Sequence, residues 1–185
     1  MELNQWYKKG LSGIDYIESM DKLKNSSLHI YRSFTPPTDN SFLQSLKKKN
    51  LRVIVLAEDW CGHCMLNIPI LLRLTEQVDM PVRFLRRDEN LELMDQYLTN
   101  GKSRTIPIFI FIDENGNEVT KWGPLADYTK QFTDKHRAKL PAKDAEDYDE
   151  KFMDMVKMTA RTFHDDSSFW DGVYTSLKEQ LQTVL

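Results

Sequence analysis

The chain has 185 residues, of which 41% are hydrophobic and 29% charged, a composition typical of globular proteins. A chain of this length can bury a core without disulfides or a structural metal. The formal net charge of −3 argues against nucleic acid as the main partner, because phosphate binding favours a clear basic excess. Charged residues interrupt the first 20 residues, so we predict neither a secretory signal nor a membrane partner.

The N-terminal part of the chain has apolar residues at roughly helical spacing. This spacing predicts a helix over residues 3–24, broken once by two glycines. Residues 27–34 fit either a short strand or the end of a helix. After a proline-containing loop, a further helix is expected to begin behind Asp39 or Ser41 and to end near residue 50.

The middle of the chain carries strand and helix patterns in alternation. Its first strand pattern is apolar and β-branched without alternation, which is typical of a strand buried on both faces. An Asn-Gly pair between the last two strands indicates a hairpin. We expect strands at residues 51–57, 82–85, 107–112 and 118–122, and helices after Cys64, over residues 90–99 and over residues 126–140.

Two more helices are expected beyond residue 141, separated near residues 164–168. They carry too much apolar surface for a free tail and should pack on the domain or form a dimer contact. The order of elements predicts an α/β three-layer sandwich with a central mixed sheet. We divide the chain into an N-terminal helical segment packed on the core (1–50), a core (51–140) and a C-terminal helical extension (141–185).

The only two cysteines, Cys61 and Cys64, stand two residues apart in the string Trp60-Cys61-Gly62-His63-Cys64. This string follows a predicted buried strand and opens a predicted helix. Cys61 is therefore expected at a helix N-terminus, where free backbone N–H groups and the helix dipole stabilise a thiolate. The spacing allows Cys64 to attack a mixed disulfide formed at Cys61.

Three other interpretations of the cysteine pair remain open. A zinc site usually needs four ligands, and only His63 lies beside the two cysteines, so we expect no metal. A structural disulfide across so small a ring would add little stability, and two packed thiols could lack chemistry altogether. With no secretory signal, a close pair is more often catalytic or metal-binding, and we predict a cytoplasmic protein in a reducing compartment.

The motifs resemble those of the thioredoxin family. The string Glu58-Asp59-Trp60-Cys61-Gly62-His63-Cys64 resembles its active-site segment, with the Gly-His pair of protein disulfide isomerases. Pro69 matches the proline that kinks the family's active-site helix, and residues 104–107 resemble its cis-proline loop. The resemblance spans about residues 50–140, extends to a bacterial branch of thioredoxin-like proteins, and implies a thioredoxin-like fold without a cofactor.

The resemblance also implies roles for residues around the cysteines. Trp60 would pack beside the sulfurs and shield them. The Ile106–Pro107 peptide bond would be cis and would place the Ile106 backbone where it pairs with an extended substrate chain.

Gly62 and His63 are expected to tune the site. A protonated His63 beside the Cys61 thiolate would stabilise the reduced form and make the protein a weaker reductant than a typical thioredoxin. We expect Arg86 and Arg87 at a solvated strand end, away from the substrate.

Two positions depart from the family pattern. Val55 stands where thioredoxins have a buried aspartate that handles the proton of the second cysteine, and Phe84 stands near the position of a family lysine. Glu58 and Asp59 are expected at the exposed end of the strand, so neither replaces that aspartate. The family's proton handling at Cys64 therefore does not carry over.

These observations predict a thiol–disulfide oxidoreductase that reduces or exchanges protein disulfides through Cys61 and Cys64. Its partners would be disulfide-containing proteins and a reductant. One alternative is a redox-sensing or partner-binding module on the same fold. Another is a thiol peroxidase, although the sequence before Cys61 lacks the activating threonine or arginine of such enzymes.

Overall fold

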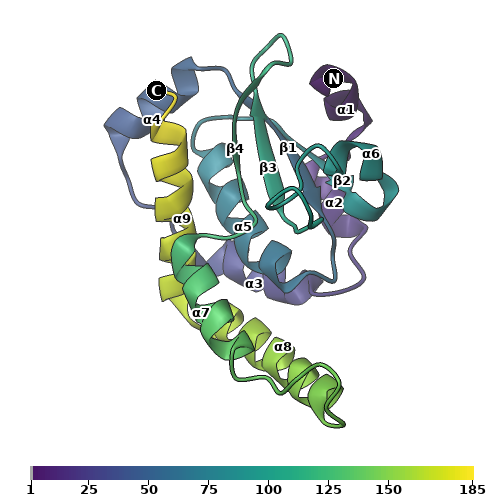
Figure 1. Cartoon of the computed structure of the whole chain (residues 1–185). Helices are drawn as coiled ribbons and strands as arrows, with labels where there is room; N and C mark the ends of the chain where they lie inside the picture. Colours follow the sequence, from purple (N-terminus) through teal and green to yellow (C-terminus); the bar gives the residue numbers. More distant parts are fainter. Residues whose placement is uncertain (1) are drawn as a thin grey trace.

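A four-stranded mixed sheet forms the centre of the computed structural model, which describes residues 2–185 (Figure 1). The sheet has the order β2-β1-β3-β4, with β1 parallel to β2, and with β3 antiparallel to both of its neighbours. Each strand lies within one residue of its expected bounds. The strands are β1 (Arg52–Ala57), β2 (Val82–Arg86), β3 (Ile108–Ile112) and β4 (Glu118–Trp122).

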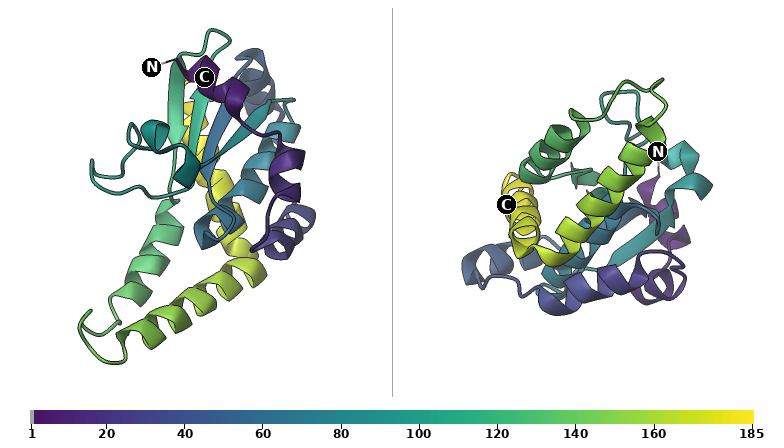
Figure 2. Two further views of the ribbon diagram at one scale, coloured as in Figure 1. Left: turned by 90° about the vertical axis from the view of Figure 1, so that its right-hand side faces the viewer. Right: turned by 90° about the horizontal axis from the view of Figure 1, so that it is seen from below.

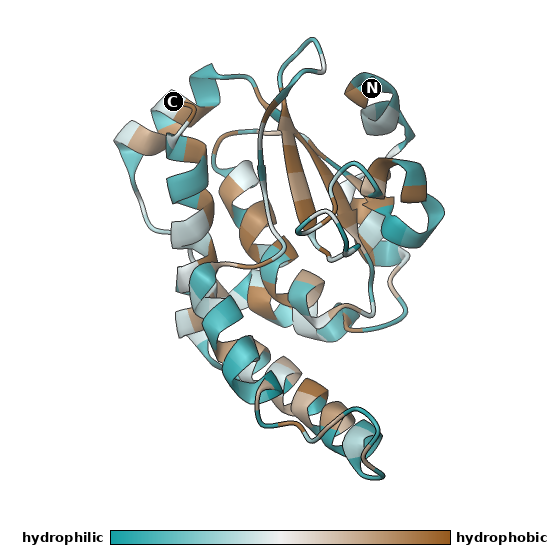
Figure 3. Ribbon diagram, in the orientation of Figure 1, coloured by the Kyte–Doolittle hydropathy of each residue, from teal (hydrophilic) through white to brown (hydrophobic). Residues whose placement is uncertain are grey.

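Helices cover both faces of this sheet, which gives the predicted three layers (Figures 1 and 2). The short α6 (Leu91–Met94) lies on one face, and α5 (Gly62–Glu76) with α9 (Ser167–Gln182) lies on the other. Every residue of β3 is buried, which explains why the central strands lack polar alternation. Figure 3 shows these strands as the most hydrophobic part of the ribbon.

The N-terminal segment forms four helices and joins the sheet. They are α1 (Leu3–Lys9), α2 (Gly13–Glu18), α3 (Lys24–Ser33) and α4 (Asn40–Lys48). The predicted first helix breaks at Gly10, where an added Cβ would lie 2.8 Å from the Arg83 Cβ. Glycine allows the chain to pass this close to β2. Leu11 then exchanges two backbone hydrogen bonds with Phe84, at 2.8 and 2.9 Å.

The helix predicted over residues 90–99 is wrong in length, since α6 ends at Met94. Beyond it, Tyr97 is buried, and its hydroxyl donates a 2.6 Å hydrogen bond to Glu118 of β4. Asn100 and Gly101 follow in the left-handed region, with φ of 53° and 66°. This tertiary contact and the turn override the apolar spacing that favoured a longer helix.

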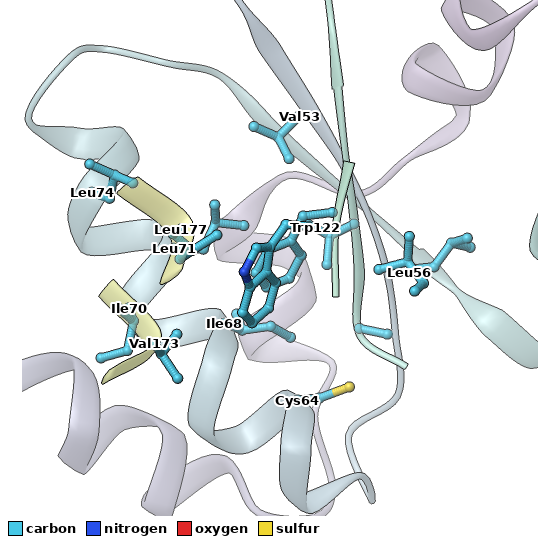
Figure 4. Packing of buried hydrophobic residues seen from close by; sticks show 14 of the residues in the cluster. Val53, Leu56, Cys64, Ile68, Ile70, Leu71, Leu74, Trp122, Val173 and Leu177 are labelled. Carbon is cyan, nitrogen blue, oxygen red and sulfur yellow. The ribbon is translucent and has the colours of Figure 1, made fainter. Parts of the chain in front are cut away.

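The last helix of the predicted core is α7 (Asp127–Arg137), and the two helices of the C-terminal extension are α8 (Tyr148–Asp165) and α9. The expected packing on the domain is confirmed for α9, whose Val173, Leu177 and Leu181 have no exposed surface and lie against α5 and β4 (Figure 4). The helices α7 and α8 form an arm that extends from the body beyond the N-terminal end of α5 (Figures 1 and 2). All three segments of the chain thus contribute to one hydrophobic core.

Replacing Leu177 with alanine tests the contribution of α9 to this core. Leu177→Ala removes fully buried apolar surface and should lower the free energy of unfolding by about 2–5 kcal/mol in urea denaturation. Leu185→Ala is the matched control, because Leu185 is 40% exposed and should change stability by less than about 0.5 kcal/mol. Equal effects of the two substitutions would contradict the packing described here.

Candidate active site

The two cysteines lie across the first turn of α5, directly after β1 and its short connecting loop. Cys61 is the N-cap of the helix, and its sulfur accepts a 3.3 Å hydrogen bond from the Cys64 backbone N–H. The Cys61 thiol donates to the Ile106 carbonyl oxygen at 3.6 Å. Both thiols are free and buried, with 8% of Cys61 and 2% of Cys64 exposed.

The environment of Cys61 favours its thiolate. A hydrogen bond from the Cys64 side chain is the largest cause that lowers the Cys61 pKa below its usual value. Burial opposes this change, while the backbone N–H groups of Cys64 and His63 and the charge of Arg87 reinforce it. Cys61 therefore has the character of a nucleophile at a helix N-terminus.

Cys64 has the opposite character. Burial raises its pKa well above the usual value, and the hydrogen bond and charge of Cys61 raise it further. Figure 4 shows Cys64 at the border of the packed apolar cluster. The pair is thus divided into a thiol that ionises readily and a thiol that retains its proton.

The cis Ile106–Pro107 peptide bond is confirmed. It places the Ile106 carbonyl against Cys61, as the hydrogen bond between them shows. Gly123, at the end of β4, packs on this loop with a φ of 125°, and a Cβ there would lie 2.3 Å from the Pro107 carbonyl oxygen. Only glycine fits that position. The Gly123–Pro124 bond is also cis, which the sequence did not predict.

Trp60 lies beside the cysteines with 46% of its surface exposed. The guanidinium carbon of Arg87 lies 5.0 Å from the centroid of the indole ring, a cation–π contact. Arg87 also donates a hydrogen bond to the Arg104 carbonyl oxygen at 3.0 Å. Its side chain therefore links Trp60 to the cis-proline loop. The expected solvated position of Arg86 and Arg87 is wrong, since their side chains are only 22% and 18% exposed.

The expectation of a protonated His63 is also wrong. His63 is half-buried, with its ring 6.1 Å from that of Phe163 in α8. Burial, and then the charge of Arg137, lowers the pKa of His63 to about 4, so the imidazole is neutral at pH 7. His63 therefore favours the Cys61 thiolate through its backbone N–H. A Cβ on Gly62 would meet open space, so the fold does not require glycine there.

Glu58 and Asp59 are buried, at 4% and 8% exposure, which corrects their predicted place at an exposed strand end. Asp59 accepts hydrogen bonds from the backbone N–H groups of Asp21 and Lys22, at 2.8 and 3.2 Å, so the segment after α2 covers this loop. Glu58 accepts a 2.8 Å hydrogen bond from the Asp88 backbone N–H. Burial raises the pKa of Glu58.

Val55 and Phe84 are fully buried neighbours in the β1–β2 register. Neither of these apolar side chains can take up the proton of Cys64, as expected from the sequence. Within residues 2–185, no group of three or more His, Cys, Asp or Glu side chains is placed to hold a metal ion. The same described residues contain no helix long and apolar enough to cross a membrane.

This geometry defines a thioredoxin-like domain with a pair of cysteines at the start of a helix. The thioredoxin family model Thioredoxin_9 matches residues 10–139, and the chain belongs to this family. The match begins before α2, so it includes most of the N-terminal segment. No curated protein matches the chain.

Two solved structures share the fold. The crystal structure of an HIV epitope-scaffold is 12% identical with a TM-score of 0.66, over 100% of this chain and 97% of its own. A protein of unknown function from Pseudomonas aeruginosa is 12% identical with a TM-score of 0.62, over 89% of this chain and 95% of its own. Both likenesses concern the fold alone, and the first spans the whole chain, including its N- and C-terminal helices.

Arg87 provides a test of the electrostatics at Cys61. Arg87→Gln removes a charge that lowers the Cys61 pKa, so the pH profile of Cys61 alkylation should move to higher pH, with a several-fold slower reaction at pH 7. Arg83→Gln is the control, because Arg83 contacts Tyr7 instead, 5.8 Å from its ring centroid. An unchanged profile in Arg87→Gln would contradict the assigned role.

Proposed function

We propose that the protein is a thiol–disulfide oxidoreductase that reduces or exchanges disulfides in other proteins. The observation that carries the proposal is the placement of the two thiols in one helical turn: Cys61 is the N-cap that accepts a backbone N–H, and Cys64 is buried inside the helix. This placement shifts the pKa of Cys61 down and that of Cys64 up. Thiol–disulfide exchange needs a thiolate to attack and a second thiol to complete the reaction. Cys61 suits the first role, and Cys64 suits the second.

In the proposed reaction, the Cys61 thiolate attacks one sulfur of a substrate disulfide. A mixed disulfide forms, and the other substrate sulfur leaves as a thiolate and takes up a proton. Cys64 then loses its proton and attacks the Cys61 sulfur, which releases the second substrate thiolate. The product is a Cys61–Cys64 disulfide, and an external dithiol reductant must convert it back.

The surroundings of Cys61 favour an extended polypeptide as substrate. The Ile106 backbone lies against the sulfur and belongs to an irregular loop next to β3, where a second chain can pair with it. Trp60 adds an exposed aromatic surface beside the sulfur. Since the reaction starts from a reduced pair, we assign the protein to a reducing compartment such as the cytoplasm.

A partner-binding or redox-sensing module is the second candidate. The arm of α7 and α8 supports it, because Met153 and Val156 of α8 are 49% and 40% exposed. A methionine on an exposed face adapts to varied partners. A complex that persists after both cysteines are replaced would favour this candidate, and turnover of a disulfide substrate would favour the oxidoreductase.

Insulin reduction with dithiothreitol as the reductant tests the proposal. The wild type should reduce insulin catalytically, and Cys61→Ser should show no activity above the uncatalysed rate. Cys64→Ser should accumulate mixed disulfides that resist dilution, because the second attack is absent. Mixed disulfides that form on Cys64 in the Cys61→Ser variant, and not in Cys64→Ser, would reverse the assignment.

A further inference from the structure

Tyr16 of α2 lies in the core behind the active site. Its side chain has no exposed surface, and its ring stacks on Phe84 of β2 with centroids 4.4 Å apart and planes 10° from parallel. Phe84 is the register neighbour of Val55 in β1. Tyr16 therefore packs directly on Phe84, one of the two apolar residues at positions where the resemblance to thioredoxins would place ionisable ones.

The helix α2 packs on β2, and its first residue, Gly13, also lies beside α5. An added Cβ on Gly13 would lie 3.8 Å both from Leu72 of α5 and from the ring of Phe84. The segment after α2 is held at the active-site loop by the two hydrogen bonds to Asp59. Arg86 donates to the carbonyl and hydroxyl oxygens of Ser19, both at 2.9 Å. The N-terminal segment thus packs directly against the active-site loop.

The Tyr16 hydroxyl has no hydrogen-bond partner among the described residues, although it is fully buried. Such a group is costly unless a partner forms at some stage of function or a trapped water satisfies it. Burial raises the pKa of this hydroxyl most, the charges of Cys64, Asp59 and Glu58 raise it further, and the charge of Arg86 lowers it. Among these groups the Cys64 thiolate has the largest effect.

We propose that Tyr16 is a positioning residue for the second step, in which its hydroxyl donates a hydrogen bond to the Cys64 thiolate, directly or through one trapped water. The proposal rests on the proposed function, because only the exchange reaction creates a thiolate at this buried position. A hydrogen bond from a neutral donor stabilises a buried anion without adding a charge to the core. The apolar environment of the pair strengthens that bond.

Bonds and protons balance in this step of the exchange reaction. Cys64 loses a proton and attacks Cys61, the bond between Cys61 and the substrate sulfur breaks, and the Cys61–Cys64 bond forms. The proton released by Cys64 is balanced by the proton that the departing substrate thiolate takes up. Tyr16 keeps its own proton throughout, as its burial and anionic neighbours require.

The test separates the two steps with the aromatic disulfide 5,5′-dithiobis(2-nitrobenzoate). The first thionitrobenzoate release reports attack by Cys61, and the second reports attack by Cys64 on the mixed disulfide. Tyr16→Phe keeps the ring stacking and removes only the hydroxyl. It should slow the second release roughly tenfold, the effect of losing one hydrogen bond to a charged group. The first release should keep its rate, and the pH profile of the second should move to higher pH.

Tyr97→Phe is the matched control, because Tyr97 is also buried but bonds to Glu118 of β4. It should leave both releases unchanged. Replacement of Tyr16 by 3-fluorotyrosine keeps the hydroxyl and makes it a more acidic donor, so the pH profile of the second release should move to lower pH. A hydroxyl with a purely structural role would leave that profile unchanged. This variant also serves as the test if Tyr16→Phe fails to fold.

The outcomes separate the two proposals. If the second release has the same rate in Tyr16→Phe and in the wild type, and insulin is still reduced, the role of Tyr16 is overturned and the proposed function stands. A wild type that shows no second release and no insulin reduction overturns the proposed function as well. A second release that slows in Tyr97→Phe as much as in Tyr16→Phe also overturns the specific role of Tyr16.

Discussion

The first turn of α5 imposes different environments on two chemically identical thiols. A helix N-terminus offers backbone N–H groups that no residue within the helix can use, and Cys61 occupies the N-cap position where its sulfur accepts one of them. Cys64 follows inside the helix, where the same turn directs it into the core. The chemistry of the site depends on this difference between the environments of Cys61 and Cys64, and the surrounding helices and strands maintain it.

Both ends of the chain contribute to that environment. From the N-terminal segment, Tyr16 is fully buried against Phe84 of β2, and the backbone after α2 satisfies the buried carboxylate of Asp59. From α8, Phe163 lies against His63, and burial with the charge of Arg137 in α7 keeps the imidazole neutral. The helices outside the central sheet are therefore parts of the active site as well as of the core.

The strands and the cysteine pair could be predicted from the sequence because their signals are local. An apolar β-branched run such as β1 and a Cys-X-X-Cys string before a helix require no knowledge of distant residues. The helix expected over residues 90–99 failed because the contact of Tyr97 with Glu118 is tertiary. The Gly10 break likewise depends on the approach of β2, which adjacent residues do not encode.

The electrostatic expectations failed for a related reason. Glu58 and Asp59 follow a strand end, which usually faces solvent, but the N-terminal segment covers them. His63 was expected to be a cation because the predicted nucleophile, Cys61, lies two residues before it, whereas α7 and α8 determine its burial. A charge state depends on all the groups that pack around a residue, and most of those groups are distant in the sequence.

The different environments of the two thiols should make them titrate far apart and in a fixed order. Carbon-13 labelling of the cysteine Cβ atoms and an NMR titration of the reduced protein measure both midpoints directly. We predict that Cys61 titrates below the value of about 8.5 for an ordinary thiol, and that Cys64 titrates well above it. Midpoints that coincide, or a lower midpoint for Cys64 than for Cys61, would contradict it.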